Sequence, residues 1–199
     1  MEAEFTYYED FFHVVVDTYR EIVKLEKEHN ELQASLGQSE NISEDLTDKL
    51  AEKNDRIGRL ALIVVIFCAT SLEAYINHYA ISKLSKNYFT TYLDKLDLFS
   101  KWIVIPRIVT GTQLDAGSKP LQDLSWLITL RNKLVHPKSR KVSIDDMKKT
   151  DFLWREDAER AIETVRHLVQ ELKKIDDSIY IDWTTKKYER YPFFDWLDY

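Results

Sequence analysis

The chain has 199 residues, a formal net charge of −6 and only 4 Gly and 4 Pro. So few turn-forming residues favour long helices and argue against a strand-rich sandwich. The acidic balance excludes a protein that coats nucleic acid over its whole surface, so any RNA contact must be local. The single cysteine, Cys68, excludes an internal disulfide, and its apolar surroundings predict a buried, inert thiol.

Two long helices are predicted in the first half of the chain. Apolar residues recur at three- and four-residue steps, which predicts an amphipathic helix over about residues 4–35. Ser43 followed by two acidic residues is typical of a helix start, and the apolar spacing then continues to about Leu84, with a bend expected near Gly58. We interpret the two helices as an antiparallel hairpin with polar outer ends.

The run Leu60–Ala69 is the most apolar segment of the chain. It is shorter than the roughly 20 residues that a membrane-spanning helix needs. The first residues, MEAEFTYYEDFF, lack the basic region and apolar stretch of a signal peptide. We therefore expect a cytoplasmic protein without a membrane segment.

The second half of the chain predicts further helices. One or two short helices fit residues 87–109 and are expected to stop near Pro106, and a loop follows over residues 110–120. The next helix should end near His136, because the residue before a proline disfavours the α conformation. The most regular apolar spacing then predicts a helix over about residues 155–176.

These elements predict an all-α fold, an antiparallel helical bundle with long N-terminal helices and a single domain over residues 1–177. Residues 178–199 form an aromatic C-terminal tail with eight Tyr, Trp and Phe residues. So many aromatic side chains should pack on the bundle or on a partner.

Residues 131–136, RNKLVH, form the most informative segment. A guanidinium, as in Arg131, holds a phosphate with two parallel hydrogen bonds, and His136 can take and give a proton near neutral pH. Asn132 adds an amide that can orient either partner. The four other histidines have no convergent ligands, so we expect no metal and no other cofactor.

The spacing within this segment also raises a difficulty. Five residues at about 100° each place Arg131 and His136 roughly 140° apart around a straight helix. The length of the arginine side chain, the proline-terminated helix end or a subunit interface must close this gap. If residues 128–140 form one straight helix with the two side chains diverging, the catalytic hypothesis weakens.

A local excess of positive charge accompanies the segment. Residues 131–149 contain seven basic and two acidic residues, in a chain that is acidic overall. The candidate RNA-binding residues are Lys133, Lys138, Arg140 and Lys141, because such a patch attracts phosphates. The alternative is an ordinary solvated surface.

Three stretches resemble the HEPN superfamily (higher eukaryotes and prokaryotes nucleotide-binding), whose members are small helical bundles: residues 71–77 (SLEAYIN), residues 124–137 (LSWLITLRNKLVHP) and the final helix. The resemblance covers about residues 45–176. It implies a metal-independent endoribonuclease, or an inactive descendant that only binds. The family's Arg-polar-x3-His element matches Arg131, Asn132 and His136, and an acidic residue that assists in some members corresponds to Glu73.

The resemblance also implies a homodimer, with one copy of the element from each subunit in a shared cleft, and a role in a toxin–antitoxin pair or in phage defence. An antitoxin or another regulatory protein is then a candidate partner. One subgroup, regulated by modification, carries Tyr two residues after the histidine. Here that residue is Lys138, which argues against the same regulation.

Less specific interpretations remain open beside the nuclease. His136 can serve as a helix C-terminal residue that interacts with the last carbonyls, and Arg131 can pair with Glu73 to hold two helices together. The whole protein can be a non-catalytic HEPN-like module that binds RNA, a nucleotide or a protein partner.

Overall fold

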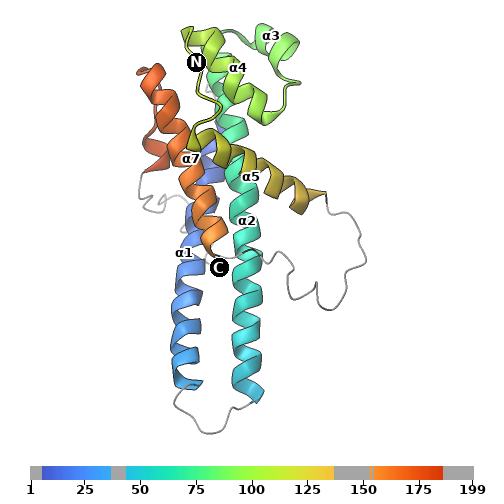
Figure 1. Cartoon of the computed structure of the whole chain (residues 1–199), viewed down its shortest axis with the longest axis vertical. Helices are drawn as coiled ribbons and strands as arrows, with labels where there is room; N and C mark the ends of the chain where they lie inside the picture. The colour runs from blue at the N-terminus through green and yellow to red at the C-terminus, as the bar shows by residue number, and fades with distance from the viewer. Residues whose placement is uncertain (1–5, 37–43, 137–152, 154, 186–199) are drawn as a thin grey trace, which may run out of the picture.

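The computed structural model describes residues 6–36, 44–136, 153 and 155–185. These described residues form helices and loops without any β-strand, which confirms the all-α fold class. In chain order the elements are α1 (Tyr7–Leu36), α2 (Glu44–Lys83), α3 (Lys86–Tyr88), the π-helical turn η1 (Phe89–Leu93), α4 (Leu98–Thr110), α5 (Lys119–Val135), α7 (Arg155–Ile175) and the 3₁₀ turn η2 (Asp182–Thr184) (Figure 1).

Helices α1 and α2 form the antiparallel hairpin that the sequence predicts, and they span the long axis of the molecule (Figure 1). Phe12, Val15 and Ile22 are buried, and their spacing places them along one face of α1. α2 remains helical through Gly58. A Cβ there would lie 3.5 Å from the backbone oxygen of Leu153, an ordinary van der Waals distance, so this neighbour does not require a glycine.

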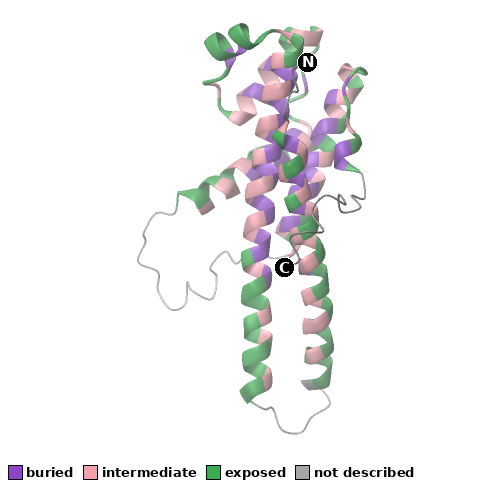
Figure 2. Cartoon of the chain, turned by 180° about the vertical axis from the view of Figure 1, so that it is seen from behind, coloured by how far each residue is buried: buried purple, intermediate pink, exposed green. Residues whose placement is uncertain are grey.

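The distal half of the hairpin is a polar arm that projects from the bundle (Figure 2). We call residues 23–35 and 44–56 the distal arm, and none of these described residues is buried. Cross-helix ion pairs hold its base, with Lys53 2.6 Å from Glu28 and Arg56 2.6 Å from Glu21. Exposed pairs of this kind stabilise a protein by at most about 1 kcal/mol each.

The core lies around the proximal half of α2, which packs against α1, α4, α5 and α7. α7 presents one apolar face to this core, and its buried residues are Ala158, Ala161, Ile162, Thr164, Val165, Leu168, Val169 and Leu172. Because α2 is covered from several sides, its residues from Ile57 to Ala80 are buried around much of the helix circumference (Figure 2).

The central position of α2 also bears on its apolar composition. It is the one helix of the described residues that is long and apolar enough to cross a membrane, with an 18-residue window of mean hydropathy 1.9. The apolar stretch is therefore longer than the run Leu60–Ala69 picked out from the sequence. A buried core helix passes the same test, and 56% of this window is buried inside the bundle.

The prediction that a helix stops near Pro106 is wrong. α4 continues past Pro106 to Thr110 and ends at Gly111, whose φ of 78° is left-handed. Trp102, Ile105 and Pro106 are all buried, so packing of this face keeps the helix intact although proline supplies no N–H. The left-handed glycine is the usual way to end a helix.

The two helices that follow have the predicted bounds within one or two residues. α5 begins beside Pro120 and ends at Val135, and His136 leaves the α conformation with φ −122° and ψ 60°, as expected before a proline. α7 occupies residues 155–175 of the predicted 155–176.

Trp183, in the segment predicted to be a tail, is a core residue. Its side chain is fully buried, and its ring centroid lies 5.1 Å from those of Tyr8 and Tyr75 and 5.3 Å from that of Phe12. Tyr180, by contrast, is 43% exposed. The remaining six aromatic residues of the segment lie outside the described residues. The start of the chain, the middle of α2 and the first part of this segment therefore share one aromatic cluster.

Candidate functional site

Two of the predicted site residues come together on neighbouring helices. Glu73 projects from α2 and Arg131 from α5, and Nη2 of Arg131 lies 3.4 Å from Oε2 of Glu73. Each side chain is about one-third exposed. The contact is a single long hydrogen bond, so the ion pair leaves most of the guanidinium donors available.

Asn132 joins this pair. Nη1 of Arg131 donates to Oδ1 of Asn132 at 3.0 Å, so the two terminal nitrogens of the guanidinium, Nη1 and Nη2, donate to two different side chains. Together Glu73 and Asn132 fix the direction of the guanidinium plane. The remaining N–H groups of Arg131 have no other partner among the described residues.

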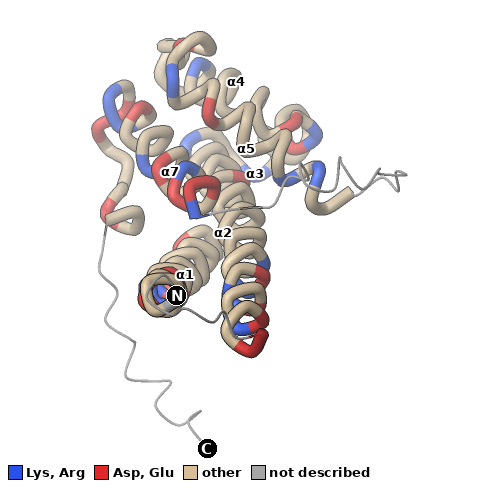
Figure 3. The backbone as a smooth tube through the Cα atoms, turned by 60° about the horizontal axis from the view of Figure 1, so that its bottom comes forward, with Lys and Arg blue, Asp and Glu red and all other residues tan. Residues whose placement is uncertain are grey.

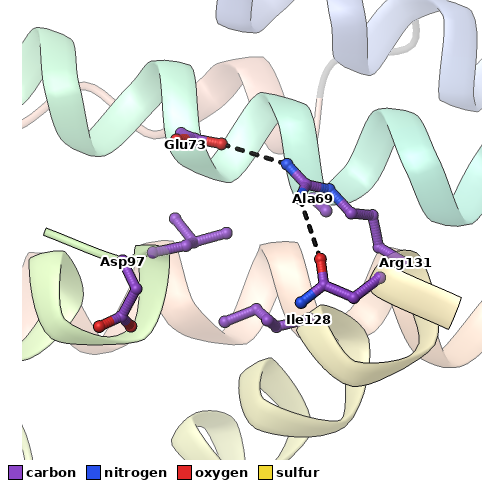
Figure 4. Close-up of a pocket in the computed structure, with 7 residues that line it drawn as sticks. Ala69, Glu73, Asp97, Ile128 and Arg131 are labelled. Atoms are coloured by element: carbon purple, nitrogen blue, oxygen red, sulfur yellow. Dashed lines mark hydrogen bonds and ion pairs between the residues drawn. The ribbon is translucent and has the colours of Figure 1, made fainter. Parts of the chain in front are cut away.

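The pair lies on a pocket of about 200 Å³ between α2, α4 and α5 (Figure 4). Its lining consists of Ala69, Glu73, Asp97, Leu98, Ile128, Arg131 and Asn132. Ala69 lies one helical turn before Glu73, and its small side chain leaves room for a cavity beside α2. Figure 4 shows Asp97 and Arg131 at opposite ends of the pocket.

Asp97 is a pocket residue that the sequence interpretation missed. It is the N-cap of α4: Oδ1 accepts from the backbone N–H of Ser100 at 3.0 Å, and Oδ2 accepts from the Ser100 hydroxyl at 2.6 Å. These hydrogen bonds from Ser100 lower the pKa of the Asp97 carboxyl below its ordinary value. The aspartate three residues before a serine at the start of an apolar run was the available signal.

Lys101 was missed as well. It lies on α4, one turn after Asp97, and its side chain is only 2% exposed. Its Nζ lies 3.7 Å from Oε1 of Glu73 and 5.7 Å from the centroid of the Phe89 ring. A single lysine within the apolar stretch of residues 98–106 was the signal in the sequence, because buried lysines are rare.

His136 does not line the pocket. It is the exposed C-cap of α5, and its backbone N–H donates to the backbone carbonyl oxygen of Asn132 at 3.0 Å. α5 ends at Val135, so residues 128–136 do not form one uninterrupted helix. The change of backbone direction at His136 nevertheless does not place its imidazole in the lining of the pocket. Within one chain, Glu73, Arg131 and Asn132 therefore contact one another, whereas His136 lies apart from them at the C-terminal end of α5.

The predicted RNA-binding residues are only partly described. Lys133 is exposed on the last turn of α5, whereas Lys138, Arg140 and Lys141 lie outside the described residues. Figure 3 shows where the described Lys and Arg residues fall along α5. Within the described part of the chain, no group of three or more His, Cys, Asp or Glu residues could hold a metal ion.

Cys68 is buried in α2, as the sequence predicts. Its side chain has no solvent exposure, and this burial raises the pKa of the thiol far above its ordinary value. A thiol that stays protonated at physiological pH is a poor nucleophile.

Comparisons with protein-family models, with curated proteins and with solved structures found no match to this chain. Fold and site therefore define the protein as an all-α bundle in which an arginine and a glutamate from two helices meet on a pocket.

Proposed function

We propose that the protein is a metal-independent endoribonuclease of the HEPN type that works as a homodimer. The observation that carries the proposal is the presentation of Arg131 on a pocket, one-third exposed and oriented by Glu73 and Asn132. A guanidinium held in this way can bind the non-bridging oxygens of a phosphodiester with its free N–H groups.

In the proposed reaction the ribose 2′-OH attacks the adjacent phosphorus. The new 2′-O–P bond forms as the P–O5′ bond breaks, which leaves a 2′,3′-cyclic phosphate and a free 5′-OH. Arg131 stabilises the charge that develops on the phosphoryl oxygens. One His136 accepts the 2′-OH proton and a second His136 gives a proton to the leaving 5′ oxygen, an effect typically worth about 100- to 10,000-fold.

The exposure of His136 supports the dimer. The histidine lies outside the pocket of its own chain and faces solvent at the end of α5, where a second copy can bring its own α5 end alongside. Asp97, at the far end of the pocket, would repel a phosphate, so the scissile phosphate belongs at the Arg131 end. Such a nuclease suits a toxin or a phage-defence protein restrained by an antitoxin or another regulatory partner.

The direct test is incubation of the purified protein with RNA in EDTA. We expect cleavage that survives chelation, leaves 2′,3′-cyclic phosphate ends and disappears in His136→Ala. His167→Ala is the matched control, because His167 is a half-exposed histidine of α7 that lies 3.6 Å from Glu163 and does not line the pocket. Failure of a dimeric, inhibitor-free sample to cleave any RNA would overturn the proposal.

The second candidate is a non-catalytic binding or scaffold module. It is favoured by the same ion pair, since Glu73 neutralises Arg131 while His136 stays outside the cavity. This function predicts that His136→Ala leaves partner binding unchanged. Removal of residues 186–199, which keeps Trp183 in the core, would then abolish that binding if the last aromatic residues dock the partner.

A further inference from the structure

We infer that Lys101 is a positioning residue for the arginine of the site: its buried ammonium holds one oxygen of Glu73, so that the other oxygen holds Arg131. This inference rests on the proposed function for its kinetic test, but its structural test is independent of it.

The geometry places a single carboxylate between two cations from two other helices. Oε1 of Glu73 lies 3.7 Å from Nζ of Lys101 on α4, and Oε2 lies 3.4 Å from Nη2 of Arg131 on α5. The two cations therefore share one carboxylate, with one oxygen facing each of them. Through it, α2, α4 and α5 share one electrostatic contact.

The burial of Lys101 is the unusual part of this arrangement. A charged group in the protein interior has a desolvation penalty that packing alone does not offset, so it needs a specific compensating interaction. Among the described residues, Glu73 is the carboxylate paired with Lys101, and the ring of Phe89 at 5.7 Å is its cation–π neighbour. Lys101 has no second carboxylate there that would explain its burial.

Phe89 adds a second constraint on the ammonium. It begins the π-helical turn η1 and is itself buried, and its ring centroid lies 5.7 Å from the ammonium. π-helical turns are uncommon and recur at functional sites. Here the turn supplies the aromatic face against the ammonium.

The charge count shows why this matters for a phosphate. Glu73 alone would cancel the charge of Arg131, whereas Glu73 with both Lys101 and Arg131 leaves the group at +1. Asp97 at the far end of the pocket brings the formal charge of the whole site to zero, so the buried ammonium offsets Glu73 only at the Arg131 end, where the glutamate still orients the guanidinium. A positioning residue of this kind acts on the transition state, so its loss lowers kcat more than it raises KM.

The kinetic experiment is a double-mutant cycle on RNA cleavage with Lys101→Met, Glu73→Gln and the two together. We expect Lys101→Met to lower kcat about 10- to 100-fold, with KM changed less than about twofold. If Lys101 acts through Glu73, adding Lys101→Met to Glu73→Gln lowers kcat less than about twofold further. Additive losses would overturn the inference.

The matched control is Lys119→Met. Lys119 also pairs with a carboxylate, but that carboxylate is Asp123 and neither residue pairs with Glu73 or lines the pocket, so its loss should leave kcat unchanged. Thermal unfolding checks that each variant folds. If Lys101→Met does not fold, Lys101→Gln, a polar variant of shorter reach, replaces it with the same expected results.

The structural experiment needs no nuclease activity. In two-dimensional NMR of the guanidinium N–H groups, the Arg131 signals are assigned by their absence in Arg131→Lys. We expect them to be resolved in the wild type, broadened or shifted in Lys101→Met and unchanged in Lys119→Met. Signals that stay unchanged in Lys101→Met would overturn the inference, whereas a wild type that cleaves no RNA would overturn only the proposed function.

Discussion

The hydroxyl of Tyr79 donates a hydrogen bond to Oδ2 of Asp176 at 2.9 Å, which joins α2 to the residue that follows α7. The same oxygen lies 3.0 Å from Nζ of Lys83, and Oδ1 accepts from the backbone N–H of Ser178 at 3.1 Å. One carboxylate therefore ties the C-terminal segment of the core to the end of α2.

We expect Asp176→Asn to lower the free energy of unfolding by about 1–3 kcal/mol at pH 7, because the buried Tyr79 hydroxyl, the Lys83 ammonium and the Ser178 N–H lose a charged acceptor. Urea denaturation measures the change. Asp177→Asn is the control: Asp177 is the exposed neighbour, and its replacement should change the free energy by less than about 0.5 kcal/mol. Equal effects of the two variants would contradict this account.

The same carboxylate predicts a pH dependence. Burial of Asp176 by itself raises the pKa of the carboxyl, but the hydrogen bonds that it accepts outweigh burial and hold the pKa well below its usual range. Its contribution to stability is therefore fully present above the unfolded pKa of about 3.9 and is lost as pH falls through the lower folded pKa. The difference between the urea midpoints of wild type and Asp176→Asn should start to shrink as pH falls below about 4 and should vanish only below the folded pKa, and a constant difference at all pH values would contradict the assignment.

Trp183 provides a prediction about the C-terminal boundary. Trp183→Ala should lower the free energy of unfolding by about 3–5 kcal/mol, because it empties the centre of a buried aromatic cluster. A chain that ends after Thr185 should keep the cooperative unfolding transition, whereas one that ends after Asp177 should lose several kcal/mol. Chemical denaturation followed by far-UV circular dichroism, which reports helix content, distinguishes the two truncated chains.

The capping role of Asp97 can be separated from the pocket. Asp97→Ala should lower the free energy of unfolding by about 1 kcal/mol, since α4 loses its N-cap, whereas Asp97→Asn keeps the cap and should cost only a few tenths. Thermal unfolding measures both. If Asp97→Asn nevertheless changes RNA cleavage strongly, the carboxylate has a role in the pocket beyond capping.

For the proposed nuclease, Arg131→Lys should lower kcat/KM by about 100- to 1,000-fold, although the positive charge remains. The lysine ammonium is a compact point charge. It lacks the planar set of N–H donors with which the guanidinium can bind Glu73, Asn132 and a phosphate at the same time. Arg20→Lys is the matched control, because Arg20 is an exposed arginine of α1 that pairs with Asp17 and does not line the pocket. An unchanged kcat/KM in Arg131→Lys would show that the reaction does not need the planar donor geometry of the guanidinium.

Local patterns in the sequence predict the helices well, and long-range packing explains the exceptions. The three- and four-residue spacing in α1, α2 and α7 is a property of each segment alone, so their bounds agree with the structure. The helix end at His136 follows from the steric effect of the next proline. Pro106 is different, because burial of its face against other helices decides whether α4 continues, and no local pattern encodes that burial.

The site divides in the same way. The sequence allows either a structural pairing of Arg131 with Glu73 or a catalytic role for Arg131. The structure shows the pair. Lys101 and Asp97 entered the site only through the crossing of α4 over α2, which brings residues distant in the chain together. The local sequence shows only that Lys101 lies in an apolar run and that Asp97 precedes a helix as its cap.

The distal arm has a consequence for local stability. None of the described residues 23–35 and 44–56 is buried, so the backbone amides there are protected mainly by the hydrogen bonds of the helices themselves. Opening of this region should need much less free energy than global unfolding. Amide hydrogens of the arm should therefore exchange with deuterium orders of magnitude faster than those around Val64 and Leu72, with protection rising step by step toward the bundle.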